Sequence, residues 1–188
     1  MIRLLALGVA LVISAPAWGD DPATDLDQHA RVIDRAASTP AGQERVANRL
    51  ARELNAGWGR PPGPYSAASL NAQRLQNRWG WGDALIINRL AQQIAEGLLK
   101  QNPAFSPLRA LAQTTAQVTR ARQHREAWGA IAKAHGVKLG GLVSSVDKTA
   151  QSIERAEKAA VRATDKATGG TSGGSGTSGG DSPPGSRR

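Results

Sequence analysis

Apolar residues recur at intervals of three and four along most of the chain between residues 25 and 166. This spacing gathers apolar side chains on one face of a helix, so it predicts an all-α protein. Alanine is common and β-branched residues are sparse, which also favours helix. The helices predicted from this pattern cover residues 25–37, 40–54, 67–77, 84–99, 107–125, 128–135, 139–146 and 147–166. We therefore expect a small bundle of five to seven helices, with the last of these segments, 147–166, as an extended helix partly detached from it.

The most strongly amphipathic segment is 84–99, and we expect the other helices to pack around it. Its apolar face comprises Ala84, Ile87, Leu90, Ala91, Ile94 and Leu98, and its polar face comprises Arg89, Gln92, Gln93 and Glu96. Leu85 and Ile86 widen the apolar arc at the start of the segment. That end should therefore be the more deeply buried.

A turn of sequence Arg-Trp-Gly-Trp-Gly-Asp precedes this segment at residues 78–83. Its two glycines are expected to let the backbone reverse, and Asp83 is expected to cap the helix. A second Trp-Gly pair opens segment 128–135, so we expect Trp81 and Trp128 to fill space between helices. Trp79 is the better candidate for exposure. An exposed indole beside Arg78 can stack on a partner.

Local signals predict where the flanking helices begin and end. Thr39-Pro40 and Ser106-Pro107 each place a capping side chain before a proline at the first helical position, and Ser66 can cap segment 67–77. Asn55-Ala56-Gly57 predicts a left-handed exit from segment 40–54. The residues predicted to face the core are Ala68, Ala72 and Leu75 in segment 67–77, and Leu108, Leu111, Ala112, Thr115 and Val118 in segment 107–125.

Residues 128–143 resemble a helix-turn-helix corner, with Gly136 at the turn between two short apolar helices. Such a corner has two interpretations: a DNA-binding element, or a compact structural corner. The second helix of the corner has no Arg, Asn or Gln to contact base edges, and Gly140 and Gly141 weaken it. Sequence-specific DNA binding is therefore disfavoured, and contact with nucleic acid that does not depend on sequence stays open.

The two ends of the chain have their own character. Arg3, a short apolar run and the small residues before residue 19 predict a secretory signal peptide over 1–19, with the protein periplasmic or secreted. The apolar run is about half the roughly 20 residues that a membrane span needs, so no transmembrane segment is expected in the mature chain. A helical domain is predicted over 20–146 and an extended, partly detached helix over 147–168. The Gly-, Ser- and Pro-rich tail over 169–188 is predicted to be disordered.

The formal net charge of the 188-residue chain is +9, and the positive charge is concentrated between residues 103 and 168. A basic surface attracts polyanions in general. We expect a non-enzymatic interaction or structural protein whose partner is an anionic polymer, lipid surface or protein of the cell envelope, with nucleic acid as the alternative. The candidate partner-binding residues are Arg78, Trp79, Arg109, Arg120, Arg122, Arg125, Lys133 and Lys138.

Signals of catalytic or cofactor chemistry are weak. The chain has no cysteine, and its three histidines, His29, His124 and His135, lack the spacing of metal ligands. The glycine-rich stretch is the tail, which has no strand or helix around it that would make a phosphate-binding loop. We therefore expect no catalytic residues, no bound metal and no cofactor.

Three stretches resemble a group of uncharacterised exported bacterial proteins. They read RVANRLARELN, RLQNRWGWGDALIINRLAQQI and AWGAIAKAHGVKLGGLV. The shared feature is a Gly-Trp-Gly-acid turn between helices, followed by a second Trp-Gly helix. The likeness covers residues 41–146, and it departs from the group in the proline-rich loop 58–65 and in lacking a glycine before Trp128. The resemblance implies an exported helical protein and implies no activity.

Overall fold

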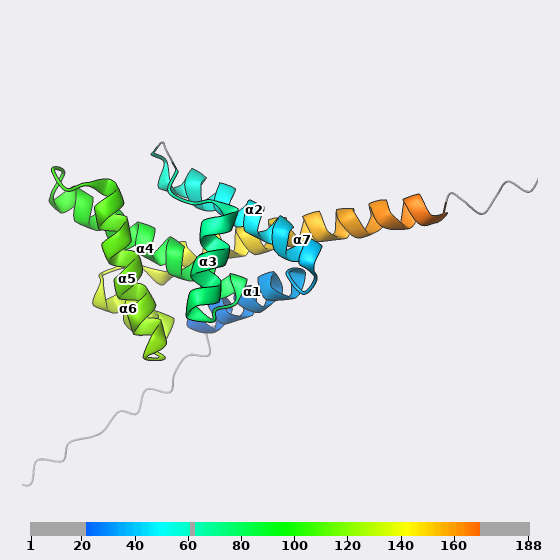
Figure 1. Ribbon diagram of the computed structural model, residues 1–188. Coiled ribbons are helices and arrows are strands. Elements are labelled where there is room, and N and C mark those ends of the chain that lie inside the picture. Colours follow the sequence, from blue (N-terminus) through cyan, green and yellow to red (C-terminus); the bar gives the residue numbers. More distant parts are fainter. Residues whose placement is uncertain (1–21, 61–62, 170–188) are drawn as a thin grey trace, which may run out of the picture.

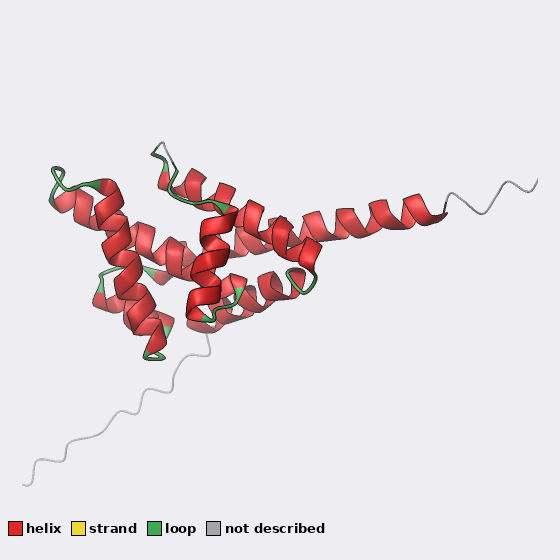
Figure 2. Cartoon of the chain, viewed as in Figure 1, coloured by secondary structure: helices red, strands yellow, loops and turns green. Residues whose placement is uncertain are grey.

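The computed structural model describes residues 22–60 and 63–169. These residues form seven helices: α1 (Pro22–Ala36), α2 (Pro40–Trp58), α3 (Ala67–Asn77), α4 (Trp81–Gln101), α5 (Pro107–Gln123), α6 (Trp128–Ala134) and α7 (Leu139–Gly169). The described residues contain no strand (Figure 2), which confirms the predicted all-α class. The predicted signal peptide over 1–19 lies outside the described residues, as does all of the predicted tail after Gly169.

Helix α4 is the centre of the bundle, and α1, α2, α3, α5 and α7 all contact it. Leu85, Ile86 and Ile87 are fully buried, so the start of α4 is deeply enclosed, as predicted. The predicted polar face is only partly correct, because Gln92 is buried rather than exposed. Its side-chain amide donates to the backbone carbonyl of Leu54 at 2.7 Å, and this bond satisfies the buried polar group.

The start of α4 differs from the prediction. The helix begins at Trp81, its N-cap is Gly80 without a side-chain cap, and Asp83 lies in its first turn. The missing acceptor comes from another helix, since the Gly82 N–H donates to the Asp34 carboxylate of α1 at 3.0 Å. Asp34 therefore does the capping that the sequence assigned to Asp83. Its negative charge also suits the positive end of the α4 dipole.

The two glycines of the turn serve close packing rather than backbone reversal. Only Gly59 and Gly136 have a positive φ among the described glycines, and the positive φ in this turn belongs to Arg78, at 58°. A Cβ on Gly82 would lie 2.3 Å from the Ala30 Cα, and one on Gly80 would lie 2.4 Å from an Asp34 carboxylate oxygen. Helix α1 thus lies directly against the start of α4, and a side chain at either glycine would block that contact.

The tryptophans lie between helices. Trp58, Trp81 and Trp128 are buried, which confirms the predicted role of Trp81 and Trp128. Trp79, expected to be exposed, is partly buried against the core. The Arg122 guanidinium lies 3.9 Å from the centre of the Trp128 ring, and the Trp128 indole N–H donates to Asp27 at 3.0 Å. The Trp128 indole is therefore held by contacts on both its face and its edge.

Helix α2 begins as predicted but ends later. Thr39 is its N-cap, with Pro40 in the first turn. The predicted exit at Asn55-Ala56-Gly57 is wrong, because the helix continues to Trp58 and Gly59 adopts the left-handed conformation. Asn55 instead holds the loop before α3: its side chain donates to the Tyr65 carbonyl at 2.8 Å and accepts from the Tyr65 N–H at 3.0 Å. Helix α3 then starts at Ser66 in a capping box, as expected from a serine at that position.

The buried faces of α3 and α5 are rotated relative to the prediction. Leu75 and Leu108, both expected in the core, are 60% and 52% exposed. The fully buried residue of α3 is Leu70, and α5 buries Ala110, Leu111, Thr114 and Val118. Thr114 belongs to this face because its hydroxyl donates to the Ala91 carbonyl of α4 at 2.9 Å. The polar residue Thr114 thus occupies a core position that the apolar pattern did not predict.

The segments predicted as 139–146 and 147–166 form one helix, α7, so no boundary separates residues 146 and 147. Leu142, Val146, Ala150 and Ile153 are buried. They lie where α7 packs along α1, and beyond them the helix extends away from the bundle (Figure 1). The helix-turn-helix-like corner is present, formed by α6, a turn with Gly136 at φ 67°, and the start of α7. Within the described ranges, no helix combines the length and apolar character that a bilayer crossing requires.

Candidate functional site

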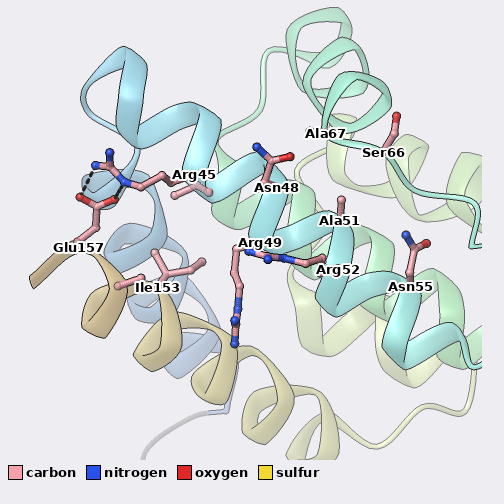
Figure 3. A pocket seen from close by; sticks show the side chains of 12 residues that line it. Arg45, Asn48, Arg49, Ala51, Arg52, Asn55, Ser66, Ala67, Ile153 and Glu157 are labelled. Carbon is pink, nitrogen blue, oxygen red and sulfur yellow. Dashed lines mark hydrogen bonds and ion pairs between the residues drawn. The ribbon is translucent and has the colours of Figure 1, made fainter. Parts of the chain in front are cut away.

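A groove of about 680 Å³ lies between α2 and α7. Its lining includes the buried apolar residues Val46, Ala51 and Ile153. Ser66 and Ala67, at the start of α3, line its far end. We call this cavity the α2–α7 groove (Figure 3).

Three arginines of α2 line the α2–α7 groove: Arg45, Arg49 and Arg52. Positions four and three residues apart lie on the same side of a helix, so the three guanidinium groups rise from one wall. Glu157 is the acidic residue that lines the groove. Three positive charges against one negative charge leave this surface positively charged at neutral pH.

Arg45 and Glu157 form a bidentate ion pair across the groove. The Arg45 Nε and Nη2 atoms donate to the two carboxylate oxygens of Glu157 at 2.9 and 2.8 Å (Figure 3). This hydrogen bonding raises the pKa of Arg45 above its usual value, so its charge is secure. The pair joins α2 to α7. It is solvent-exposed, and water screens the attraction within an exposed ion pair, so an incoming anion can replace Glu157 at low cost.

The other two guanidinium groups have unused hydrogen-bonding capacity. Arg49 pairs with Glu53 at 2.8 Å, but its Nε is buried and has no acceptor among the described residues. Figure 3 shows the Arg49 side chain reaching from α2 toward α7. Arg52 is exposed and forms no hydrogen bond or ion pair within the described ranges. Arginine donors in this arrangement can bind phosphate or carboxylate groups, to which guanidinium groups form bidentate hydrogen bonds.

Glu53, the ion-pair partner of Arg49, also contacts a second arginine. The Arg89 Nη2 donates to the Glu53 carbonyl at 2.9 Å and lies 3.9 Å from the Glu53 carboxylate. Arg89 is partly buried, and burial lowers its pKa, with Glu53 the main opposing influence. Glu53 is therefore shared between Arg49 and Arg89. This sharing weakens its neutralisation of the groove.

The residues proposed from sequence do not line this groove. Six of them are exposed: Arg78, Arg109, Arg120, Arg125, Lys133 and Lys138. Trp79 is partly buried. Arg122 stacks on Trp128, approaches Asp83 at 3.4 Å and donates to the Glu126 carbonyl at 3.0 Å. Its charge is thus engaged within the fold and is not displayed to a partner.

The structure brings some of these residues to one end of the bundle. The Gln123 side chain of α5 donates to the Asn77 side chain of α3 at 3.1 Å, so the ends of these helices meet. Arg78 directly follows Asn77, and Arg120 and Arg125 flank Gln123 in sequence. Arg109 lies eleven residues before Arg120 on the same helix, about 16 Å away along its axis. The predicted set is therefore not a single site.

Sequence reasoning missed the groove because it counted charge by segment. Residues 20–60 contain slightly more acids than bases, so their arginines drew no attention and were assigned to the solvent face of a core helix. The signal that would have found them is spacing: Arg45, Arg49 and Arg52 share one helix side next to the apolar stripe. That α7 forms the opposite wall depends on tertiary packing and is not visible in the local pattern.

The fold and groove together define the class as an all-helical bundle with an arginine-lined groove. No protein-family model, curated protein or solved structure matches the chain. The described residues hold no group of three or more His, Asp or Glu side chains arranged to bind a metal ion. The function must therefore be argued from the groove and the charged surface.

Proposed function

We propose that this is a non-enzymatic, exported interaction protein that binds an anionic polymer of the cell envelope in the α2–α7 groove. The observation that carries the proposal is the row formed by Arg45, Arg49 and Arg52 along one wall of that groove. A polymer with repeated phosphate or carboxylate groups presents charges in a row, which matches arginines repeated along a helix. The exposed basic residues of the C-terminal half add long-range attraction.

The shape of the surface favours a chain over a membrane or a folded protein. The arginines follow one another along one side of α2, and α7 forms the facing wall. A single extended polymer strand between α2 and α7 can meet all three arginines in turn. The anion would take over the Arg45 donors that Glu157 now satisfies.

The test is a calorimetric titration of the purified protein with inorganic polyphosphate and with poly-glutamate, at low and at physiological salt. We expect binding that weakens as salt rises, because exposed charges are screened over about 8–10 Å at physiological ionic strength. The double variant Arg49→Ala/Arg52→Ala should lose at least tenfold in affinity. Circular dichroism confirms that the variant is folded.

The matched control is the double variant Arg120→Ala/Arg125→Ala, which removes the same charge from the exposed end of α5. It should weaken binding only two- to threefold, through the loss of general attraction. If Arg120→Ala/Arg125→Ala weakens binding more than Arg49→Ala/Arg52→Ala does, the polymer binds on the C-terminal surface and not in the α2–α7 groove. If neither polyphosphate nor poly-glutamate binds at low salt, the proposed function is refuted.

A second candidate is nucleic-acid binding without sequence preference at the helix-turn-helix-like corner. Lys133 and Lys138 flank the corner and are both exposed, which favours contact with phosphates. Duplex DNA is therefore included among the probes. DNA binding with a steep salt dependence that is abolished by Lys133→Glu/Lys138→Glu would support this candidate over the groove.

A further inference from the structure

A second groove lies between α3 and α5, which both contact α4 (Figure 1). Its volume is about 550 Å³, and we call it the α3–α5 groove. Unlike the α2–α7 groove, it has many uncharged polar side chains in its lining, beside apolar ones. Its lining includes the amides Gln73, Gln76, Asn77, Asn88 and Gln123 and the hydroxyl groups of Ser69, Thr115 and Thr119. Arg120 is the charged residue of the lining.

Asn88 of α4 contributes an unsatisfied acceptor to this groove. It is fully buried, and its Nδ2 donates to the Ala84 carbonyl at 2.8 Å and to the Gln73 Oε1 at 3.0 Å. Because Nδ2 must face the Ala84 carbonyl, the orientation of the amide is fixed and Oδ1 is the remaining polar atom. That Oδ1 is buried and has no donor among the described residues.

An acceptor left in this state is costly. An unsatisfied buried polar atom destabilises the fold because it has lost its bond to water, and in folded proteins such atoms are rare. A ligand hydroxyl or N–H that reaches the Asn88 Oδ1 recovers this energy on binding. The same arrangement rejects a ligand that lacks the donor.

The two walls of the groove differ in character. The α3 wall presents the amides of Gln73 and Gln76, whereas the α5 wall carries an apolar strip between its hydroxyl groups. That strip comprises Leu108, Leu111, Ala112 and Ala116. Leu108 is 52% exposed at the groove, so an apolar surface is available to a ligand there. A ligand that fits has polar edges and an apolar face, and since Arg120 is the one charged residue of the lining, it needs no charge of its own.

We propose that the α3–α5 groove binds a neutral saccharide chain, with a sugar hydroxyl donating to the Asn88 Oδ1. A sugar hydroxyl both donates and accepts hydrogen bonds, as do the carboxamides of the α3 wall. The C–H face of a sugar ring packs against the Leu108–Ala116 strip. The lining of α5 from Leu108 to Gln123 extends about 22 Å along the helix, which is enough for several rings. This inference does not depend on anion binding in the α2–α7 groove.

The test is calorimetric titration of the purified full chain with two neutral oligosaccharides, cellotetraose and the tetramer of N-acetylglucosamine. We expect one of them to bind at micromolar to millimolar concentration with no dependence on salt, since no ion pair is formed. Salt independence separates this site from the polyanion site. Success or failure at either site is therefore read separately.

Two variants locate the site. Gln76→Ala/Gln123→Ala changes side chains at the groove surface and should weaken binding at least tenfold; because Gln123 also donates to Asn77, circular dichroism confirms that the variant is folded. Asn88→Leu replaces the unsatisfied amide by a larger apolar side chain with the same branching and should abolish binding, with the same check of folding. The control is Gln113→Ala, which removes an exposed amide elsewhere on α5 and should leave affinity unchanged.

Three results would overturn the proposal. One is the absence of binding by both oligosaccharides at millimolar concentration, which would mean that solvent alone occupies the site beside the Asn88 Oδ1. Another is binding that the Gln76→Ala/Gln123→Ala variant leaves unchanged. The third is selective binding of a neutral peptide in place of the sugars, which would make the groove a peptide site.

Discussion

Replacement of Gly82 by alanine tests the central packing of the bundle. The new Cβ would lie 2.3 Å from the Ala30 Cα and 2.5 Å from both the Ala30 Cβ and the Ala30 carbonyl oxygen. These are mostly backbone atoms of α1, so no side-chain rotation relieves the clash. Helix α1 must move away from α4, and the core between them must open.

The magnitude follows from two opposing effects. Overpacking a core costs about 1–3 kcal/mol, and a clash with backbone belongs at the upper end of that range. Alanine in place of glycine within a helix returns about 0.5–1 kcal/mol. We therefore expect Gly82→Ala to lower the free energy of unfolding by about 2 kcal/mol. The assay is urea unfolding followed by far-UV circular dichroism, read as a shift of the midpoint at constant slope.

Helix α4 supplies its own control in Gly97, around which a new Cβ would meet nothing within 4 Å. Gly97→Ala should raise the free energy of unfolding by about 0.5–1 kcal/mol. The two variants make the same chemical change in the same helix, so their difference isolates the contact with α1. If Gly82→Ala is as stable as Gly97→Ala, the close approach of α1 to α4 is wrong.

Two further variants examine the acids around the same turn. Asp34→Ala removes the acceptor of the Gly82 N–H and should cost about 1–2 kcal/mol in the same unfolding assay, whereas Arg31→Ala, at an exposed position of α1, should be neutral. Burial raises the pKa of Asp83, and the Arg122 charge opposes it only in part. The folded state therefore binds a proton more readily than the unfolded state, so lowering the pH through the raised pKa toward 3.8 should stabilise the wild type relative to Asp83→Asn. A difference between the two proteins that is independent of pH would contradict this reasoning.

The parts of the fold that sequence predicted correctly are those set by local physics. The caps at Thr39 and Ser66 bond to backbone within three residues, so neighbouring positions are enough to predict them. The long apolar face of α4 predicted that the other helices pack around it, although α1 and α2 are more amphipathic than α4. Trp81 and Trp128 were predicted to be buried because a Trp-Gly pair recurs at the start of a second helix.

The errors arise where a partner from another helix decides the outcome. Asp83 looked like a cap, but Asp34 lies closer to the free N–H groups because α1 packs against Gly82. The exposed leucines of α3 and α5 looked like core residues because their apolar side chains satisfy the helical period. The positions that are buried instead include Thr114 and Asn88, whose polar groups find acceptors on the backbone of α4. A pattern that counts only apolar residues cannot predict such burial.

The candidate sites failed to emerge from sequence for a related reason. The tryptophan turn is the most distinctive stretch of the chain, yet its rings pack within the fold: Arg74 lies over Trp81 at 4.8 Å, and Trp79 is partly buried against the core. Rings covered by their neighbours have little surface left to offer a ligand. A candidate site is more reliably marked by polar groups that the fold leaves incomplete.

Helix α3 separates the two surfaces that meet this criterion. Its first residues, Ser66 and Ala67, border the α2–α7 groove, while Ser69 and Gln73 border the α3–α5 groove. Since α3 buries only Leu70 fully, its position depends on polar contacts at its ends, including the hold of Asn55 on the loop at Tyr65. The two grooves therefore share a lightly anchored wall. The polar groups that line the two grooves therefore belong to opposite ends and sides of one short helix, and each groove can be tested by variants that leave the other unchanged.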